Sequence, residues 1–285
     1  MSSDAVPACF QRNADRVASH RSEVLAHRAV NARYRYLRLR GDAALVAATR
    51  PGQFYQLRCP ISADAQPFLL RPMSVYGTGP EPGEIEFLYN VTGLGTQALA
   101  ALPVGGALDI VGPLGNTFRL DAGDRRILVV ARGVVLATMA PLLRQAAAAG
   151  VAVTAVMSAR TPADLMRDEF LRGIEADVFA VHDSDGSSGV EAVEALLRRL
   201  LSGQRHDAVY TCGSHRLLML LQRVLADYPD IRAEVAMEQR MACGMGVCLS
   251  CVRRFDVAGR KQFLRVCREG PVFDIRSVTG EVEFG

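Results

Sequence analysis

The stretch Met241-Ala-Cys-Gly-Met-Gly-Val-Cys-Leu-Ser-Cys251 contains three cysteines, and Cys267 follows the last of them after fifteen intervening residues. This Cys-x4-Cys-x2-Cys spacing with a distant fourth cysteine is the plant-type ligand pattern of a 2Fe-2S cluster. Such a cluster needs four thiolates, and a tight loop supplies three of them only if its backbone folds closely around the metal. Glycines at 244 and 246 permit that approach, because glycine readily adopts positive φ. The sequence therefore predicts a 2Fe-2S cluster held by Cys243, Cys248, Cys251 and Cys267.

Two other interpretations of the same cysteines are a structural zinc site and ordinary thiols. Zinc sites are usually built from paired Cys-x2-Cys motifs, and only Cys248 and Cys251 have that spacing. A disulfide framework is typical of short secreted chains, whereas Cys9, Cys59 and Cys212 are isolated in a chain of 285 residues. The clustering favours a metal centre in an intracellular protein.

The composition predicts a soluble globular protein with two or three domains. Hydrophobic residues make up 49% of the chain and charged residues 22%, and the net charge is +3. No basic run indicates nucleic-acid binding, and no apolar stretch approaches the ~18 residues of a membrane span. Residues 1–20 lack the apolar segment of a signal peptide and are expected to form a polar N-terminal extension. We therefore expect a cytoplasmic protein.

The segment before the cysteines alternates strand-like and helix-like stretches. Strands are predicted at 126–130, 151–157, 177–181, 207–211 and 231–237, the last strand, with helices at 136–149, 163–171, 190–201 and 214–228. This alternation is typical of a doubly wound parallel sheet. We predict a nucleotide-binding α/β domain at 123–236 and a small cluster domain at 237–285.

The N-terminal part has a different, strand-rich pattern. Arg33-Tyr-Arg-Tyr-Leu-Arg-Leu-Arg40 alternates polar and apolar residues at period two. Similar stretches at 53–58 and 84–89 are separated from one another by glycine and proline turns. Many short strands with glycine turns indicate a small antiparallel barrel or sandwich, here at residues 21–122.

Two motifs in this region suit a ligand that carries phosphate. Arg71-Pro-Met-Ser-Val75 offers a guanidinium that can clamp a phosphate. Gly93-Leu-Gly-Thr96 offers backbone donors and a hydroxyl where a helix can begin. Each motif alone would also fit an ordinary surface turn.

The predicted carboxyl ends of the parallel strands carry candidate dinucleotide ligands, because the ligand crevice of such a sheet lies there. The position after the first strand suits a phosphate, and an aspartate after the third could accept hydrogen bonds from ribose hydroxyls. In chain order the candidates are Gly133, Arg160, Asp183 or Asp185, and Cys212 with Gly213. Polar, glycine-rich loops are also common in any α/β domain.

Taken together, these motifs resemble those of a known protein family. The chain resembles the electron-transfer subunit of the two-subunit dihydroorotate dehydrogenase, within the ferredoxin-reductase superfamily. The matching elements run in family order: Pro51-Gly-Gln-Phe54, Arg71-Pro-Met-Ser74, Gly93-Leu-Gly-Thr96, Gly112-Pro-Leu-Gly115, Cys212-Gly213, Glu238-Gln-Arg-Met-Ala-Cys-Gly-Met-Gly-Val-Cys248 and Val266-Cys267. The cysteine segment is the specific part, and the other motifs are shared by many flavin reductases.

The resemblance implies an antiparallel flavin-binding β-barrel, a nicotinamide-binding α/β domain and a C-terminal 2Fe-2S domain. It places the Cys212 thiol near the nicotinamide ring as a small packing group. It also implies a partner, a flavoprotein catalytic subunit that oxidises dihydroorotate, in a heterotetramer. The FAD contacts that it implies are Arg71, Pro72, Met73, Ser74, Leu88, Tyr89, Asn90, Gly95 and Thr96.

One segment departs from the family pattern. The family's first α/β loop is usually Gly-Gly-Gly-x-Gly, whereas this chain has Ala131-Arg-Gly-Val-Val135. Arg132 adds a charge that could bind phosphate, but the two valines would crowd it. Arg160 could meet the 2′-phosphate of NADP.

The expected activity is electron transfer between the redox centre of a partner and NAD, through the cluster and FAD. FAD is needed because nicotinamide moves two electrons as a hydride while the cluster accepts one. No acid-base pair is expected, and no domain of this chain is expected to oxidise a substrate. Two alternatives stay open: an NAD(P)H-dependent flavin and iron-sulfur reductase that feeds another acceptor, and a relay that has lost nicotinamide binding.

Overall fold

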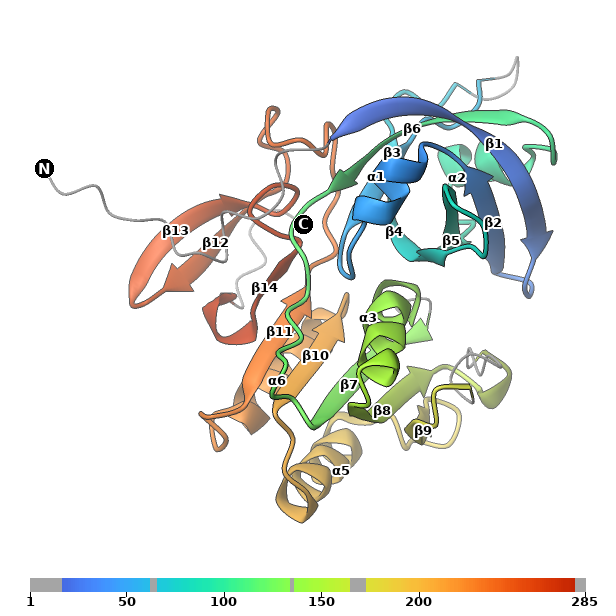
Figure 1. The fold of residues 1–285 in the computed structure, drawn as a ribbon. Coiled ribbons are helices and arrows are strands. Elements are labelled where there is room, and N and C mark those ends of the chain that lie inside the picture. Colours follow the sequence, from blue (N-terminus) through green and yellow to red (C-terminus); the bar gives the residue numbers. More distant parts are fainter. Residues whose placement is uncertain (1–16, 62–65, 134–135, 165–172, 280–285) are drawn as a thin grey trace, which may run out of the picture. The chain divides into compact units, whose positions relative to one another are not determined.

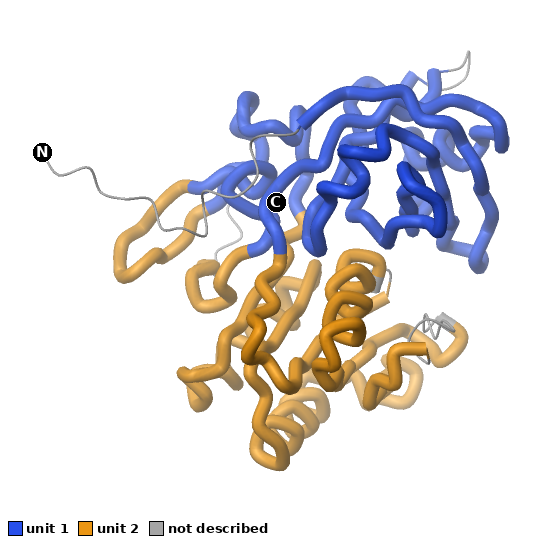
Figure 2. The backbone as a smooth tube through the Cα atoms, viewed as in Figure 1, with its two compact units in different colours: residues 1–117, 239–253, 264–272 blue, residues 118–238, 254–263, 273–285 orange. Residues whose placement is uncertain are grey.

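The computed structural model describes residues 17–61, 66–133, 136–164 and 173–279. The chain divides into two compact units (Figure 2). The first contains residues 1–117, 239–253 and 264–272, and the second contains residues 118–238, 254–263 and 273–285. No helix in the described ranges is long and apolar enough to cross a bilayer.

The first unit is built on a closed barrel of six antiparallel strands (Figure 1). Neighbours around the barrel follow the order β1-β2-β5-β4-β3-β6. The strands are β1 (Ala18–Ala29), β2 (Tyr34–Arg40), β3 (Phe54–Leu57), β4 (Arg71–Thr78), β5 (Glu84–Asn90) and β6 (Ala107–Leu114), and the short helices are α1 (Ala43–Ala48) and α2 (Leu94–Ala100). The predicted barrel is confirmed, and β1 begins at Ala18, inside the stretch that the sequence suggested as an extension.

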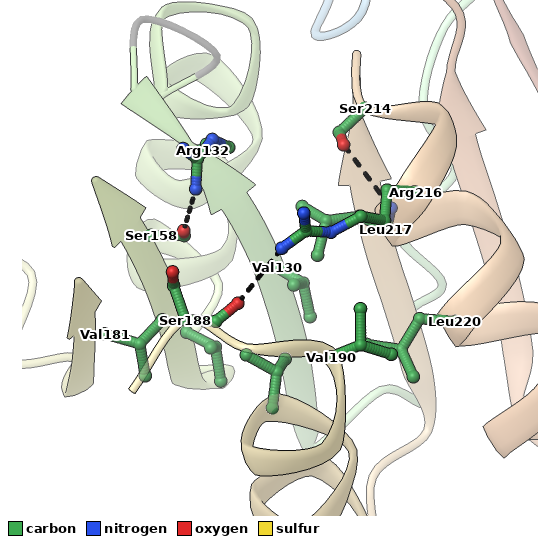
Figure 3. A pocket seen from close by; sticks show the side chains of 12 residues that line it. Val130, Arg132, Ser158, Val181, Ser188, Val190, Ser214, Arg216, Leu217 and Leu220 are labelled. Carbon is green, nitrogen blue, oxygen red and sulfur yellow. Dashed lines mark hydrogen bonds between the residues drawn. The ribbon is translucent and has the colours of Figure 1, made fainter. Parts of the chain in front are cut away.

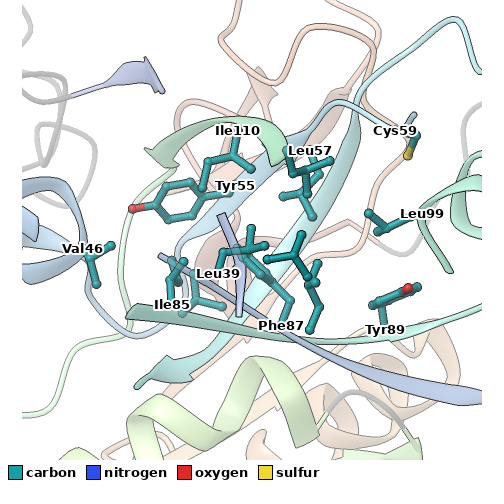
Figure 4. Packing of buried hydrophobic residues seen from close by; sticks show 14 residues of the cluster. Leu39, Val46, Tyr55, Leu57, Cys59, Ile85, Phe87, Tyr89, Leu99 and Ile110 are labelled. Carbon is teal, nitrogen blue, oxygen red and sulfur yellow. The ribbon is translucent and has the colours of Figure 1, made fainter. Parts of the chain in front are cut away.

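The period-two pattern explains the barrel interior. Alternate residues of β2 and β5, such as Leu37, Leu39, Ile85 and Phe87, are fully buried (Figure 4). The Tyr55 and Phe87 rings pack edge to face, with their centroids 6.0 Å apart. Burying side chains of this size stabilises the fold by about 1.5–3 kcal/mol each. Closure of the barrel also removes the exposed strand edges.

The second unit contains a six-stranded sheet in the order β14-β11-β10-β7-β8-β9. Its strands are β7 (Arg126–Arg132), β8 (Ala152–Ala159), β9 (Asp177–His182), β10 (Ala208–Cys212), β11 (Arg232–Ala236) and β14 (Val272–Asp274). The five strands from β7 to β11 pair in parallel, so the predicted doubly wound sheet is confirmed. β14 was not predicted, because the sheet was expected to end at 237.

The strand order reverses at β7, which has β8 on one side and β10 on the other. The helices are α3 (Leu136–Ala148), the short 3-10 turn η3 (Pro162–Asp164), α5 (Val190–Gly203), α6 (His215–Leu225) and the 3-10 turn η4 (Ile275–Ser277). Because crossover connections are right-handed, this reversal puts α3 on one face of the sheet and α5 and α6 on the other. The helix predicted at 163–171 lies mostly outside the described residues.

The C-terminal segment adds a hairpin of β12 (Val252–Val257) and β13 (Arg260–Arg265). Residues 243–251, which we call the cluster loop, precede β12. After β13, the chain comes back to the barrel unit, where Val272 pairs with Asn116. The Asn116 amide donates to the Val272 carbonyl at 2.7 Å and accepts the Val272 N–H at 2.9 Å.

Candidate cluster loop and cofactor-binding residues

The cluster loop is a chain of turns that aims backbone N–H groups at sulfur. Gly244 and Gly246 have φ values of 72° and 83°, in the left-handed region that favours glycine. The Sγ atom of Cys243 accepts the N–H of Met245 at 3.4 Å and that of Cys248 at 3.5 Å. Donors placed in this way stabilise a thiolate.

Cys251 and Cys267 lie at the two ends of the β12–β13 hairpin, and their sulfur atoms are in contact. Both are buried, and their Sγ atoms lie 3.1 Å apart. The hydrogen bond from the Cys267 thiol lowers the pKa of Cys251 to about 6, and the same contact raises the pKa of Cys267. The Ser250 hydroxyl lowers the pKa of Cys248 to about 6. At Cys248 and Cys251 the surroundings therefore favour the thiolate form that metal binding requires, whereas the contact with Cys251 favours the thiol form at Cys267.

The four cysteines are thus arranged as two pairs, Cys243 with Cys248 and Cys251 with Cys267. A 2Fe-2S cluster takes four thiolates, so both the donor set and its pairing fit this group. Within the described ranges, no group of three or more His, Cys, Asp or Glu side chains is arranged around a single point that could hold one metal ion.

An ion pair anchors the far side of the cluster loop. The Arg265 guanidinium donates to the Gly246 carbonyl at 3.0 Å and pairs with the Glu269 carboxylate. The same carboxylate also accepts the Arg265 backbone N–H at 2.7 Å. Arg265 therefore fixes the turn between Cys243 and Cys248 to the chain beside Cys267.

In the barrel, the two motifs predicted to bind phosphate lie together. A Cβ atom at Gly95 would lie 2.5 Å from the Arg71 guanidinium, so the arginine packs directly on the start of α2. The Thr96 hydroxyl accepts the N–H of Thr92 at 2.9 Å and that of Gly93 at 3.1 Å. This hydroxyl therefore shapes the turn. Since Arg71 Nη1 donates to the Leu69 carbonyl, the donors left for a ligand are the Nε and Nη2 groups of Arg71 and the first N–H groups of α2.

The other predicted FAD residues divide between two faces of the barrel sheet. Met73 packs against the barrel core. Tyr89 points inward and belongs to that core (Figure 4). The Tyr89 hydroxyl is hydrogen-bonded to His27 Nε2 at 2.8 Å. Since side chains alternate along a strand, the opposite face of β4 and β5 carries Pro72, Ser74, Leu88 and Asn90.

In the α/β unit, a pocket of about 160 Å³ lies at the carboxyl ends of β7, β8 and β9 (Figure 3). Its polar lining includes Arg132, Ser158, Ser188, Ser214 and Arg216. The Arg216 guanidinium donates to the Ser188 carbonyl at 3.4 Å. This is the crevice edge on which the sequence placed the dinucleotide.

Two of the candidate nucleotide ligands are paired with each other. The Arg132 guanidinium donates to the Asp183 carboxylate at 2.6 and 3.1 Å, and to the Ser158 hydroxyl at 2.8 Å. Its hydrogen bonds hold the pKa of Asp183 well below the usual range. A ribose or phosphate at this edge must therefore compete with an existing ion pair.

The remaining nucleotide candidates are positioned by backbone geometry. Gly133 and Gly213 have φ values of 58° and 81° and follow β7 and β10, which are neighbouring strands at the strand-order reversal. Arg160 is exposed, and its carbonyl accepts the N–H of Ser184 at 3.0 Å. Cys212 is buried, and burial raises the pKa of its thiol, so this cysteine is a neutral packing group and not a nucleophile.

The C-terminal segment and most of the chain as a whole are similar to proteins of one family. Residues 238–279 match the model of the iron-sulfur cluster binding domain of dihydroorotate dehydrogenase B. The electron transfer subunit of dihydroorotate dehydrogenase B (NAD(+)) from Desulforamulus reducens is 33% identical over 232 residues, which cover 81% of this chain and 87% of that protein. The corresponding subunit from Streptococcus pneumoniae serotype 4 is 32% identical and covers 81% and 90%. The chain belongs to this family.

Two solved structures of oxidoreductases share the fold of this chain. A chain of the NADH-dependent reduced ferredoxin-NADP oxidoreductase is 26% identical, with a TM-score of 0.74 and coverage of 90% of this chain and 89% of that one. The ferredoxin reductase in carbazole 1,9a-dioxygenase is 21% identical, with a TM-score of 0.58 and coverage of 75% and 67%. The second similarity concerns the fold alone. The family resemblance inferred from the sequence motifs is confirmed.

Sequence reasoning missed several residues that shape the family's cluster site in this chain. Arg265 and Glu269 carried a weak signal, since arginine and glutamate four residues apart often pair. Gln56 carried none, because a glutamine in a strand is ordinary, and its position against Gly244 follows only from the fold.

Proposed function

We propose that this chain is the electron-transfer subunit of a dihydroorotate-oxidising complex, which passes electrons between a flavoprotein catalytic subunit and NAD through a 2Fe-2S cluster and FAD. The observation that carries the proposal is that the three cysteines of the cluster loop and Cys267 lie together as two pairs in a chain of this family. When bound, the cluster supplies one-electron transfer and FAD exchanges electrons singly or in pairs. Substrate oxidation is left to the partner.

We assign the cofactors to the predicted residues as part of this proposal. The four cysteines Cys243, Cys248, Cys251 and Cys267 hold the cluster. Arg71 and the amides at Gly95 and Thr96 hold the FAD pyrophosphate, while Pro72, Ser74, Leu88 and Asn90 present one face of the barrel to the flavin. Met73 and Tyr89 support that face from the core. The domain limits 21–122, 123–236 and 237–285 correspond in this proposal to FAD, NAD and the cluster.

The nicotinamide site is proposed at the carboxyl ends of the parallel strands. Gly133 and Gly213 leave room for the dinucleotide backbone at the strand-order reversal, where such ligands bind. Cys212 packs beneath them, and Arg160 and Asp183 lie farther along the same edge.

One experiment separates this function from its alternatives. The chain is co-expressed with a dihydroorotate-oxidising flavoprotein, and visible spectra are recorded during titration with dihydroorotate and then with NADH. The proposal expects co-purification and bleaching of both flavin and cluster bands by either reductant. Bleaching by NADH without any response to dihydroorotate would favour a reductase for another acceptor.

The Arg132–Asp183 ion pair favours a second candidate, a relay without nicotinamide chemistry. It occupies the edge that a dinucleotide would use. This candidate expects bleaching by dihydroorotate and none by NADH. An Arg132→Ala variant that gains a response to NADH would then identify the ion pair as the obstacle.

We further propose that the partner docks on the exposed apolar side chains of the cluster loop. Val247 is 81% exposed and Leu249 is 59% exposed, and the two flank Cys248, one of the proposed cluster ligands. Exposed apolar residues grouped in this way are typical of interaction sites, and docking there would place the cluster close to the partner's redox centre. The assembly is proposed to be a heterotetramer with two copies of each chain.

A Val247→Asp variant tests this docking surface. A charge buried at an interface without a partner is costly, so we expect the affinity for the catalytic subunit to fall by about 10- to 100-fold, with cluster and FAD content unchanged. Val104→Asp is the matched control, since Val104 is also strongly exposed, at 61%, but lies in the turn between α2 and β6. Equal affinities for the two variants, measured by titration calorimetry, would place the interface elsewhere.

The Arg265 anchor gives a separate prediction. In Arg265→Leu, the Gly246 carbonyl and the Glu269 carboxylate both lose their partner, so the cluster loop should loosen. We expect the cluster to be lost to an iron chelator about tenfold faster, in line with the cost of one charged hydrogen bond. Arg260→Leu in the same strand is the control, and its rate should match that of the unmodified protein.

A cytoplasmic location is also part of the proposal. It is supported by the assignment of four clustered cysteines to a metal centre, because cysteine clusters of this kind are typical of intracellular proteins, in which disulfides are rare.

A further inference from the structure

Gln56 is a fully buried glutamine whose side-chain amide has no hydrogen-bond partner in the part of the chain that the structure describes. Its neighbours in β3, Tyr55 and Leu57, belong to the barrel core. Because side chains alternate along a strand, the Gln56 amide points to the opposite face. Burying an amide without a partner is costly, so this position indicates a partner that the polypeptide does not supply.

The amide lies against the cluster loop. A Cβ atom at Gly244 would lie 2.4 Å from Gln56 Nε2, 2.8 Å from Cγ and 3.0 Å from Cδ. Gly244 directly follows Cys243 and has a φ of 72°. Only glycine therefore fits at 244, both for its backbone conformation and for the space that the Gln56 side chain takes.

A second buried glutamine in the same segment shows what a purely structural role looks like. Gln53 is 1% exposed, yet its Nε2 donates to the Gly115 carbonyl at 3.0 Å and its Oε1 accepts the Arg50 N–H at 2.9 Å. The barrel thus satisfies Gln53 with its own backbone. The Gln56 amide has no such backbone partner among the described residues, and it lies against the cluster loop instead.

We propose that the Gln56 amide donates a hydrogen bond to the sulfur atoms of the 2Fe-2S cluster on its Cys243 side and raises the reduction potential of the cluster. The inference rests on the proposed function, in which the cluster loop holds that cluster. Thiolate and sulfide sulfurs accept hydrogen bonds, and such bonds help to set cluster potentials. Reduction adds one electron from the flavin or the partner, so a buried donor stabilises the reduced form more than the oxidised form.

The backbone of Gln56 adds a requirement for the test. Gln56 is the register partner of Pro72 in β4, within the motif proposed to hold FAD. A substitution at 56 could therefore act on the flavin instead of the cluster. The two potentials must be measured separately.

The test is a redox titration of the full-length Gln56→Met variant, purified with its cofactors. Methionine keeps the length of the side chain but removes the donor. At the potential where the unmodified cluster is half reduced, we expect the reduced-to-oxidised ratio to fall about tenfold, which is 59 mV for a one-electron couple. Iron, acid-labile sulfide and the FAD potential should be unchanged. The matched control Gln53→Met should lower thermal stability and leave the cluster potential in place.

An unchanged cluster potential in Gln56→Met with full iron and sulfide would overturn the proposal, and so would a shift confined to FAD. If the variant fails to retain the cluster, pulsed EPR of the reduced, unmodified protein with ¹⁵N in its glutamine amides decides. We expect a hyperfine coupling to an amide nitrogen, and we expect it to persist in Gln239→Met, the control that removes the glutamine four residues before Cys243. Absence of the coupling would count against Gln56. Unmodified protein without iron or sulfide after reconstitution would instead refute the proposed function.

Discussion

Replacing Cys267 with alanine is expected to abolish the iron-sulfur cluster and leave the flavin in place. Cys267 is buried and supplies one sulfur of the pair with Cys251, at an Sγ–Sγ distance of 3.1 Å. The cluster needs four thiolates, and the variant leaves three. We expect near-complete loss of iron and acid-labile sulfide, with the FAD content close to that of the unmodified protein.

The measurement is a count of iron, sulfide and FAD per chain after anaerobic reconstitution. Cys59→Ala serves as the control, because Cys59 is equally buried but lies in the barrel core. That variant should lose some stability and keep its iron. Normal iron content in Cys267→Ala would show that the fourth ligand lies elsewhere.

The Cys267 prediction also shows how far the sequence alone could go. Ligand spacing is a local property, so the four cysteines and their pattern were visible without a structure. Period-two and helical alternation are local as well, and they gave the barrel and the parallel sheet. Apart from the distant Cys267, the physical cause lies in each case within a few residues of chain.

Non-local pairing was not visible in the same way. The hairpin of β12 and β13 and the short strand β14 were not predicted, because the charged and apolar residues of Val252-Arg-Arg-Phe-Asp-Val257 and Arg260-Lys-Gln-Phe-Leu-Arg265 do not alternate at period two. β14 joins the sheet next to β11, a choice that depends on packing between distant segments. A three-residue strand has too little periodicity to be recognised.

The candidate nucleotide edge shows a different limit. Arg132 and Asp183 were each predicted as possible ligand contacts, and each is correctly placed at the end of a strand. Their ion pair could not be foreseen, because they are fifty-one residues apart in the chain. Opposite charges at one sheet edge can bind a ligand or bind each other, and the sequence does not distinguish the two.

Gly95→Ala is expected to weaken FAD binding by about 10- to 100-fold without harming the fold. The new Cβ atom would lie 2.5 Å from the Arg71 guanidinium, so the guanidinium must move away. It is the far end of a flexible side chain, and alanine is favoured over glycine within a helix, so the displacement costs little stability. What is lost is the charged hydrogen bond that Arg71 offers to phosphate, which is worth about 1.5–3 kcal/mol.

The matched control for this variant is Gly93→Ala, two residues earlier in the same turn. A Cβ atom at Gly93 would meet nothing within 4 Å, so Arg71 stays in place. FAD affinity, measured by flavin fluorescence during reconstitution, should fall only in the Gly95 variant, and an Arg71→Met variant should reproduce that fall. If Gly95→Ala and Gly93→Ala bind FAD equally well, Arg71 does not hold the flavin phosphate, and the barrel must bind its cofactor through the outer face of β4 and β5 alone.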